Sequence, residues 1–316
     1  MVDFSIFGDY QNPVEFNFST AEGFSSQLRW TSQRINIFYA RTPRVESIAA
    51  REFRGFFATV FAQNMQVCSA DAEALSEALT AAADIVDYLT EQARLENERR
   101  QKVRDFAAQH DDFSDHVRDF FTGVDVPPNL TPAEPPPPQL LRLPLTRQRQ
   151  QDRSIRGSSG GISAADPKDL ISAAQVLGEA AAQVPSGSVL AGWFDDFTSQ
   201  CKYGTVEVGD LFVQLDRWRG LNDGDVEWLH AVAKAFQAAG SGVITLPNSA
   251  LRAALRAAGT PLWRTDLDIT SPGLSGIDPR TGYLEDPINS ATGNFIEPET
   301  DLAFAACLLY TSDAAD

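Results

Sequence analysis

An apolar series with heptad spacing runs through the sequence between residues 56 and 108. Its members alternate by four and three positions: Leu75, Leu79, Ala82, Val86, Leu89 and Ala93. This spacing predicts one long helix whose apolar stripe packs against another helix. From Glu91 to Asp105 the residues are mostly charged, so we expect this end of the helix to project into solvent.

A second amphipathic pattern precedes this helix. Ser19 and Glu22 form an S-x-x-E capping box, and the apolar face that follows consists of Phe24, Leu28, Ile35 and Phe38. Pro43 is expected to interrupt this helix, with a shorter segment after it. Because Gly55 separates the two patterns, we expect an antiparallel helical hairpin over residues 1–125, whose stripe could also take a helical partner protein.

A change in composition marks the end of the hairpin. Eight of the 18 prolines lie between Pro127 and Pro144, and a stretch rich in Arg, Gln, Ser and Gly follows. Polyproline is stiff and extended, whereas Gly/Ser tracts are flexible. Residues 126–165 are therefore interpreted as a linker, with a docking peptide for an aromatic groove as the alternative.

Residues 166–262 carry new helical patterns and predict a second helical bundle. Asp166 is a candidate N-cap, and Pro167 suits the first helical position. A second helix should bury Val189, Trp193, Phe197 and Cys201, and a third should bury Val208, Leu211, Leu215 and Trp218. Asn222 should cap a fourth helix that ends at Gly240, and an extended Val243–Leu246 should lead to a short last helix. The predicted fold class is mainly α, followed by a short β/turn segment within residues 263–306.

Composition excludes several classes of function. The net charge is −17, which argues against a nucleic-acid binder. No apolar run is long enough to span a membrane, and the first twenty residues lack the pattern of a signal peptide.

No sequence motif indicates catalysis. Phosphate loops, dinucleotide fingerprints, zinc motifs and C-x-x-C pairs are all absent. His110 and His116 lie among aspartates that are better explained as a solvated face, and Asp195 and Asp196 would point in different directions on a helix. His230 lies beside an apolar stripe and is interpreted as a packed or rim residue. We therefore expect no enzyme activity and assign no catalytic, cofactor-binding or metal-ligating residue.

The hairpin carries a short motif at its turn, Phe53-Arg54-Gly55. Glycine permits the tight turn there, and the aromatic side chain packs across it. This arrangement resembles the WXG-type helical hairpins that type VII secretion systems export, with Phe53 in place of the family's tryptophan. The family's Y-x-x-x-[DE] export tag would start at Tyr88, although Gln92 stands where the acid belongs. The same spacing occurs in Tyr203…Glu207, which falls in the second predicted bundle.

A second motif lies near the end of the sequence. It resembles the segment that opens the Rhs region of bacterial polymorphic toxins, whose pattern is approximately G-D-P-V-[DN]-x-A-T-G-x-[FL]…T-D-L. The matching positions include Asp286, Pro287, Asn289, Thr292, Gly293, Phe295, Thr300, Asp301 and Leu302. After it, residues 307–316 resemble a translated sequencing-library adapter, so we expect them to be an artefact and the natural protein to continue beyond Phe304.

Together these resemblances imply the N-terminal trafficking region of a secreted polymorphic toxin used in bacterial competition. Its partner would be the type VII secretion machinery, and it would reach the exterior without a signal peptide. The toxic domain would lie beyond the residues present. The alternative is a helical scaffold or cell-surface protein that assembles with helical partners.

Overall fold

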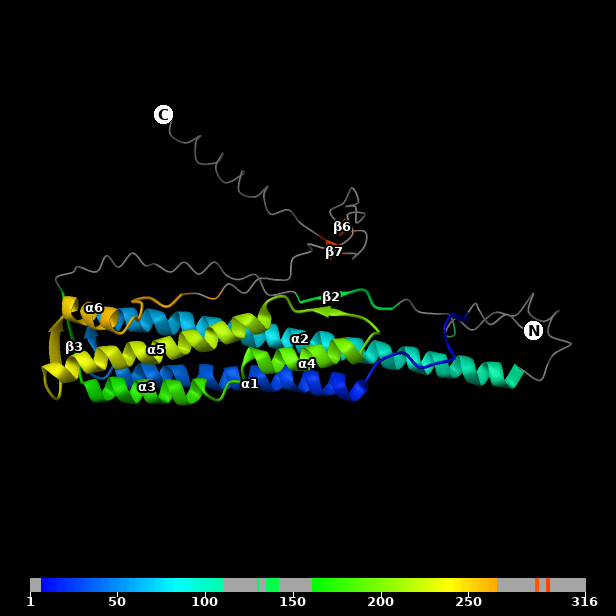
Figure 1. Cartoon of the computed structure of the whole chain (residues 1–316), viewed down its shortest axis with the longest axis horizontal. Helices are drawn as coiled ribbons and strands as arrows, with labels where there is room; N and C mark the ends of the chain where they lie inside the picture. The colour runs from blue at the N-terminus through cyan, green and yellow to red at the C-terminus, as the bar shows by residue number, and fades with distance from the viewer. Residues whose placement is uncertain are drawn as a thin grey trace, which may run out of the picture. The chain divides into compact units, whose positions relative to one another are not determined.

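The computed structural model describes residues 7–110, 130, 135–141, 161–265, 267, 288–289 and 294–295. It divides into two compact units, residues 1–272 and residues 273–316. The first unit is mainly helical (Figure 1), which confirms the predicted fold class. Its helices are α1 (Phe18–Ala49), α2 (Phe56–His110), α3 (Pro167–Ala181), α4 (Gly187–Gln200), α5 (Leu211–Ala239) and α6 (Asn248–Ala257).

Short strands accompany these helices. In the first unit β1 (Arg54–Gly55), β3 (Ile162–Ala165) and β5 (Ile244–Pro247) form a sheet in the order β1-β3-β5, with both pairs antiparallel. β2 (Gln139–Leu140) pairs in parallel with β4 (Val206–Glu207). In the second unit β6 (Ile288–Asn289) pairs antiparallel with β7 (Asn294–Phe295).

The first helix begins two residues earlier than the capping box predicts. Asn17, not Ser19, is the N-cap, because its side-chain Oδ1 accepts a hydrogen bond from the Thr20 amide at 3.2 Å. The Ser19 hydroxyl donates to the same oxygen at 2.8 Å. The Asn17 amide also donates to the Gln200 carbonyl at 3.1 Å, so this cap joins the start of α1 to the end of α4.

Pro43 does not interrupt α1, contrary to the sequence prediction. A proline has no amide hydrogen, so the carbonyl of Tyr39, four residues earlier, loses its usual helical donor. The Thr42 hydroxyl supplies a replacement by donating to that carbonyl at 2.9 Å. The side chain next to the proline thus satisfies the freed carbonyl, and the helix continues to Ala49.

The heptad series forms the contact between α1 and α2. All six of its residues are fully buried, and so are the four apolar residues predicted for α1. The antiparallel hairpin predicted from sequence is therefore confirmed (Figure 1).

The helices on the two sides of the predicted linker share one hydrophobic core. α3 and α4 pack on α1, and α5 packs on α2 and α3. The ring of Phe38 in α1, for example, meets Trp218 in α5 edge-on at a centroid distance of 4.8 Å. The structure thus differs from the sequence division into independent domains at 1–125 and 166–262, because each part covers the apolar stripe of the other.

One helix stands where the sequence analysis expects two. α5 continues through Asn222, which is not a cap but a fully buried residue whose Oδ1 accepts from the Cys68 thiol at 3.4 Å. In α4 the buried face also differs from the prediction. Leu190 and Phe197 are buried, whereas Val189 and Trp193 are exposed.

The described ends of the predicted linker belong to the fold. Gln139 and Leu140 form β2, and residues 162–165 form the central strand β3. Leu130, residues 135–138, Leu141 and Gly161 are also described, and the other linker residues lie outside the part of the chain that the structure describes. The segment therefore contributes pairing strands as well as a connection.

A charge placed in the buried seam should be strongly destabilising. Leu79→Asp in the full chain is expected to lower the free energy of unfolding by several kcal/mol, since the leucine alone contributes about 1.5–3 kcal/mol by its burial and a buried carboxylate adds a desolvation cost. Leu95→Asp is the matched control, because Leu95 lies on the same helix and is 48% exposed. Equal melting temperatures for the two variants would contradict the seam.

Candidate functional site

The turn motif lies where α1 ends and β1 begins, and each of its residues has a distinct structural role. Phe53 is buried, with ring centroids 6.3 Å from Phe61 and 6.4 Å from Trp228. The Arg54 guanidinium donates to the carbonyls of Ala50 at 2.7 Å and Arg51 at 2.8 Å. Arg54 thus binds carbonyls that the end of α1 leaves without helical partners.

Gly55 meets two requirements that only glycine satisfies easily. Its φ is +89°, a region that L side chains rarely adopt. A Cβ atom there would lie 2.4 Å from the carbonyl oxygen of Ile162 on β3. The glycine therefore permits the close approach of a third segment as well as the turn that the sequence predicts.

The two candidate tags lie in one region of the first unit. Tyr88 is 44% exposed on α2, about 50 Å along the helix from the turn at 1.5 Å per residue. Tyr203 is buried, and its pKa is raised by burial and by the nearby Glu96 and Tyr88. Its neighbour Gly204 lies against Leu89 of α2. Tyr203…Glu207, which the sequence analysis assigns to a separate bundle, is thus packed on the hairpin itself.

The far end of α2, residues 96–110, is named the distal end below. Sequence analysis predicts that it projects into solvent, but Glu96 and Arg99 are only 5% and 8% exposed. The Glu96 carboxylate accepts from Arg99 Nε at 2.7 Å and from Arg100 Nε at 2.8 Å. Burial opposes ionisation, but these two arginines outweigh it and lower the pKa of Glu96.

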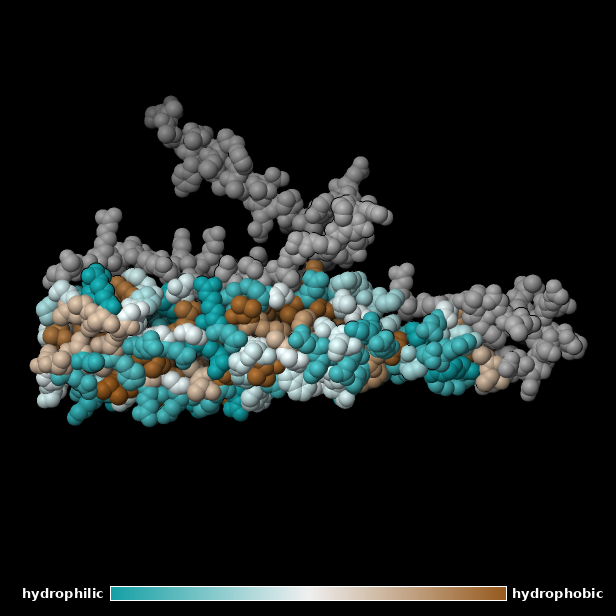
Figure 2. Space-filling view, viewed as in Figure 1, coloured by the Kyte–Doolittle hydropathy of each residue, from teal (hydrophilic) through white to brown (hydrophobic). Residues whose placement is uncertain are grey.

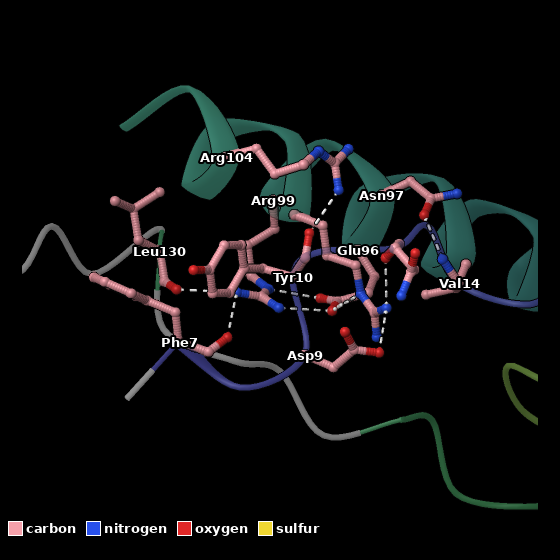
Figure 3. Close-up of polar contacts among 11 residues, drawn as sticks. Phe7, Asp9, Tyr10, Val14, Glu96, Asn97, Arg99, Arg104 and Leu130 are labelled. Atoms are coloured by element: carbon pink, nitrogen blue, oxygen red, sulfur yellow. Dashed lines mark hydrogen bonds and ion pairs between the residues drawn. The ribbon is translucent and has the colours of Figure 1, made fainter. Parts of the chain in front are cut away.

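The same arginines hold the N-terminal segment (Figure 3). Arg99 donates to the carbonyls of Phe7 at 3.2 Å and Leu130 at 3.1 Å. Arg104 donates to the carbonyl of Tyr10 at 2.6 Å. The charged residues of this stretch thus divide into two sets: Glu98, Lys102 and Asp105 are exposed, as the sequence predicts, whereas Arg99, Arg100 and Arg104 contact another part of the chain.

A second buried polar cluster involves Arg264, which no sequence motif indicates. Its guanidinium bonds to Asp225 and lies 3.6 Å from Asp71, and all three side chains are almost fully buried. Burial raises the pKa of Asp225 to about 6, although Arg264 opposes this shift. Burial likewise raises the pKa of the neighbouring Cys68 thiol to about 12, so this cysteine is not an activated nucleophile.

The second motif falls largely outside the described residues. Of the matching positions only Asn289 in β6 and Phe295 in β7 are described, and their two strands pair antiparallel. The other matching positions, Asp286, Pro287, Thr292, Gly293, Thr300, Asp301 and Leu302, lie outside the described residues.

The remaining candidates do not gather into a site. His230, Asp195 and Asp196 are exposed on their helices, and His116 lies outside the described residues. Among the described residues no group of His, Cys, Asp and Glu could hold a metal ion. Within the same residues, none of the helices is apolar over a length sufficient to cross a bilayer.

Comparisons of the chain with known protein families, with characterised proteins and with solved structures found no match. The assignment of function consequently depends on the sequence motifs and on the geometry around them.

Proposed function

We propose that this chain is the non-catalytic N-terminal trafficking module of a secreted polymorphic toxin of the Rhs type, exported by a type VII secretion system without a signal peptide. The observation that carries this proposal is the turn of the α1–α2 hairpin. There a buried aromatic residue, a capping arginine and a left-handed glycine occur in sequence at the tip of two long antiparallel helices.

The packing of Tyr203 and Glu207 supports the same proposal. The spacing Y-x-x-x-E is complete in this segment, whereas Tyr88 lacks an acid at the fifth position. Glu207 is exposed on β4, beside the helix pair that the machine would recognise. The machine would thus read a folded hairpin together with a tag supplied by a later part of the chain.

The alternative function, a helical scaffold, would need an exposed apolar surface. The hairpin stripe is covered by α3, α4 and α5 of the same chain. Exposed apolar side chains remain around a surface hollow of about 620 Å³, where Trp30 of α1 and Val189 of α4 are half-exposed. Figure 2 shows that apolar residues form separate patches among hydrophilic ones on the visible face of the first unit, rather than one continuous stripe.

Export of the full chain tests the proposal. A reporter fused after residue 316 should reach the medium of a host that has a type VII system and remain inside when that system is deleted. Glu207→Ala should lower the exported fraction several-fold, because it removes the acid of the tag without disturbing a buried residue. Glu227→Ala is the control, since Glu227 is likewise an exposed glutamate of the first unit and belongs to neither tag.

The outcomes separate the two functions. Equal export with and without the secretion system would contradict the trafficking role. Export that requires the system but does not respond to Glu207→Ala would retain the role and exclude this tag.

A further inference from the structure

Residues 7–14, named the strap below, lie along the distal end of α2 and are held mainly through their backbone (Figure 3). The carbonyls of Phe7, Tyr10 and Asn12 accept from Arg99, Arg104 and Arg100 at 3.2, 2.6 and 2.8 Å. The amide of Val14 donates to Asn97 Oδ1 at 2.7 Å. Contacts of this kind hold the main chain of an irregular peptide and depend little on its side chains, and the strap itself turns at Gly8, whose φ is +63°.

Two side chains of the strap supply the apolar contact, the buried Phe7 and the partly buried Tyr10. Phe7 is 1% exposed and packs with Val103 and Leu130 in a small cluster. Its ring lies 6.2 Å from that of Phe106, in an edge-on arrangement. This cluster is separate from the large core shared by α1 to α6. Local opening of such a small cluster costs far less free energy than unfolding of the whole unit.

Opening of the strap would change the chemistry of the distal end. Val103 would lose its apolar cover, and the guanidinium groups of Arg100 and Arg104 would lose carbonyl acceptors. The uncovered surface would combine a short apolar strip with a row of arginines, whose guanidinium groups could bind the main-chain carbonyls of another peptide. A suitable occupant is therefore an irregular segment with an aromatic anchor, which is what the strap itself provides.

We propose that the distal end of α2 is a binding surface for an aromatic-anchored peptide of irregular conformation, and that residues 7–14 are its built-in and displaceable occupant. The strap opens from Phe7 to Asn12, while Val14, which is buried in the large core, and the helices stay in place. Access to the distal end is then controlled by the strap. This inference does not depend on the proposed export role.

Hydrogen exchange on the full chain tests the proposal. Phe7→Ala removes the anchor, and amides of residues 97–108 should then exchange about tenfold to a hundredfold faster, as expected for loss of one buried phenylalanine. Amides of residues 60–90, which lie in the large core, should be unchanged. Phe7→Leu should retain most of the protection, because it keeps an apolar anchor.

A peptide added in trans tests whether the occupant is displaceable. A synthetic peptide of residues 1–15 should restore protection of residues 97–108 in the Phe7→Ala chain, whereas the same peptide with Phe7→Ala should not. Faster exchange in residues 60–90 as well would show that the strap belongs to the cooperative core and would overturn the proposal. Unchanged exchange at the distal end, or failure of the peptide to restore protection, would overturn it too.

Discussion

Gly55→Ala is expected to destabilise the first unit by several kcal/mol, although it adds a single methyl group. The new Cβ would lie 2.4 Å from the Ile162 carbonyl oxygen and 3.0 Å from Ser163. Both contacts involve residues of the central strand β3, whose backbone cannot move aside as a flexible side chain can. The left-handed φ adds about 1–2 kcal/mol of strain for any residue other than glycine. Chemical denaturation of the full chain measures the loss directly.

Gly192→Ala is the matched control and should have the opposite effect. Gly192 lies inside α4 with no atom within 4 Å of the position of a Cβ. Alanine there should increase the free energy of unfolding by about 0.5–1 kcal/mol, because it is the better helix former. A loss of stability at position 192, or none at position 55, would contradict the geometry of the turn.

Arg264→Met should cost about 3–5 kcal/mol of stability at neutral pH, the range typical for breaking a buried ion pair. The substitution keeps an apolar stem of similar length but leaves the carboxylates of Asp71 and Asp225 buried without their cation. Arg219→Met is the control, because Arg219 pairs with Asp216 at the surface, where such pairs contribute about 0–1 kcal/mol.

The cost of Arg264→Met should also depend on pH. The pKa of Asp225 is raised from 3.8 to about 6 in the folded chain, so the folded state binds this proton more tightly than the unfolded state. The stability from this proton is fully present below about pH 4 and is lost as the pH rises through 6. Without Arg264 the carboxyl can still be neutral in mild acid. The loss of unfolding free energy caused by Arg264→Met should therefore be smaller at pH 5 than at pH 8. At pH 8 the Arg264→Met/Asp225→Asn double variant should recover part of that loss. An equal loss at both pH values would contradict this account.

The sequence predicts those elements whose signal is local and periodic. The seam on α2, the cap at Asp166 and the extended segment before α6 all follow from residues a few positions apart. Its errors arise where another side chain, adjacent or distant in sequence, overrides a local signal. Thr42 compensates for Pro43 in α1, and burial of Asn222 against Cys68 turns an expected cap into the interior of a helix.

The candidate site likewise contains residues that the sequence predicts and residues that it does not. The turn motif was found because glycine and an aromatic residue stand at a break in helical periodicity. The cluster around Arg264 could not be found, since its three charged residues are 39 to 193 positions apart in the sequence. The arginines of the distal end are evident in the sequence as part of a charged stretch. Charged residues on a helix give no indication, however, that a segment about ninety residues earlier covers them.

The shared core of the first unit has a consequence for synthesis of the chain on the ribosome. The hydrogen bond from Asn64 to the Leu262 carbonyl spans 198 residues, and that from the Leu267 amide to Asp71 spans 196. Contacts of such long range form only after the intervening chain has been made, and they slow folding. The N-terminal hairpin thus emerges long before α3, α4 and α5, and its apolar stripe stays uncovered until Ala239, the last residue of α5, has left the exit tunnel. A chaperone that binds apolar helical surfaces can therefore bind the hairpin only during that interval.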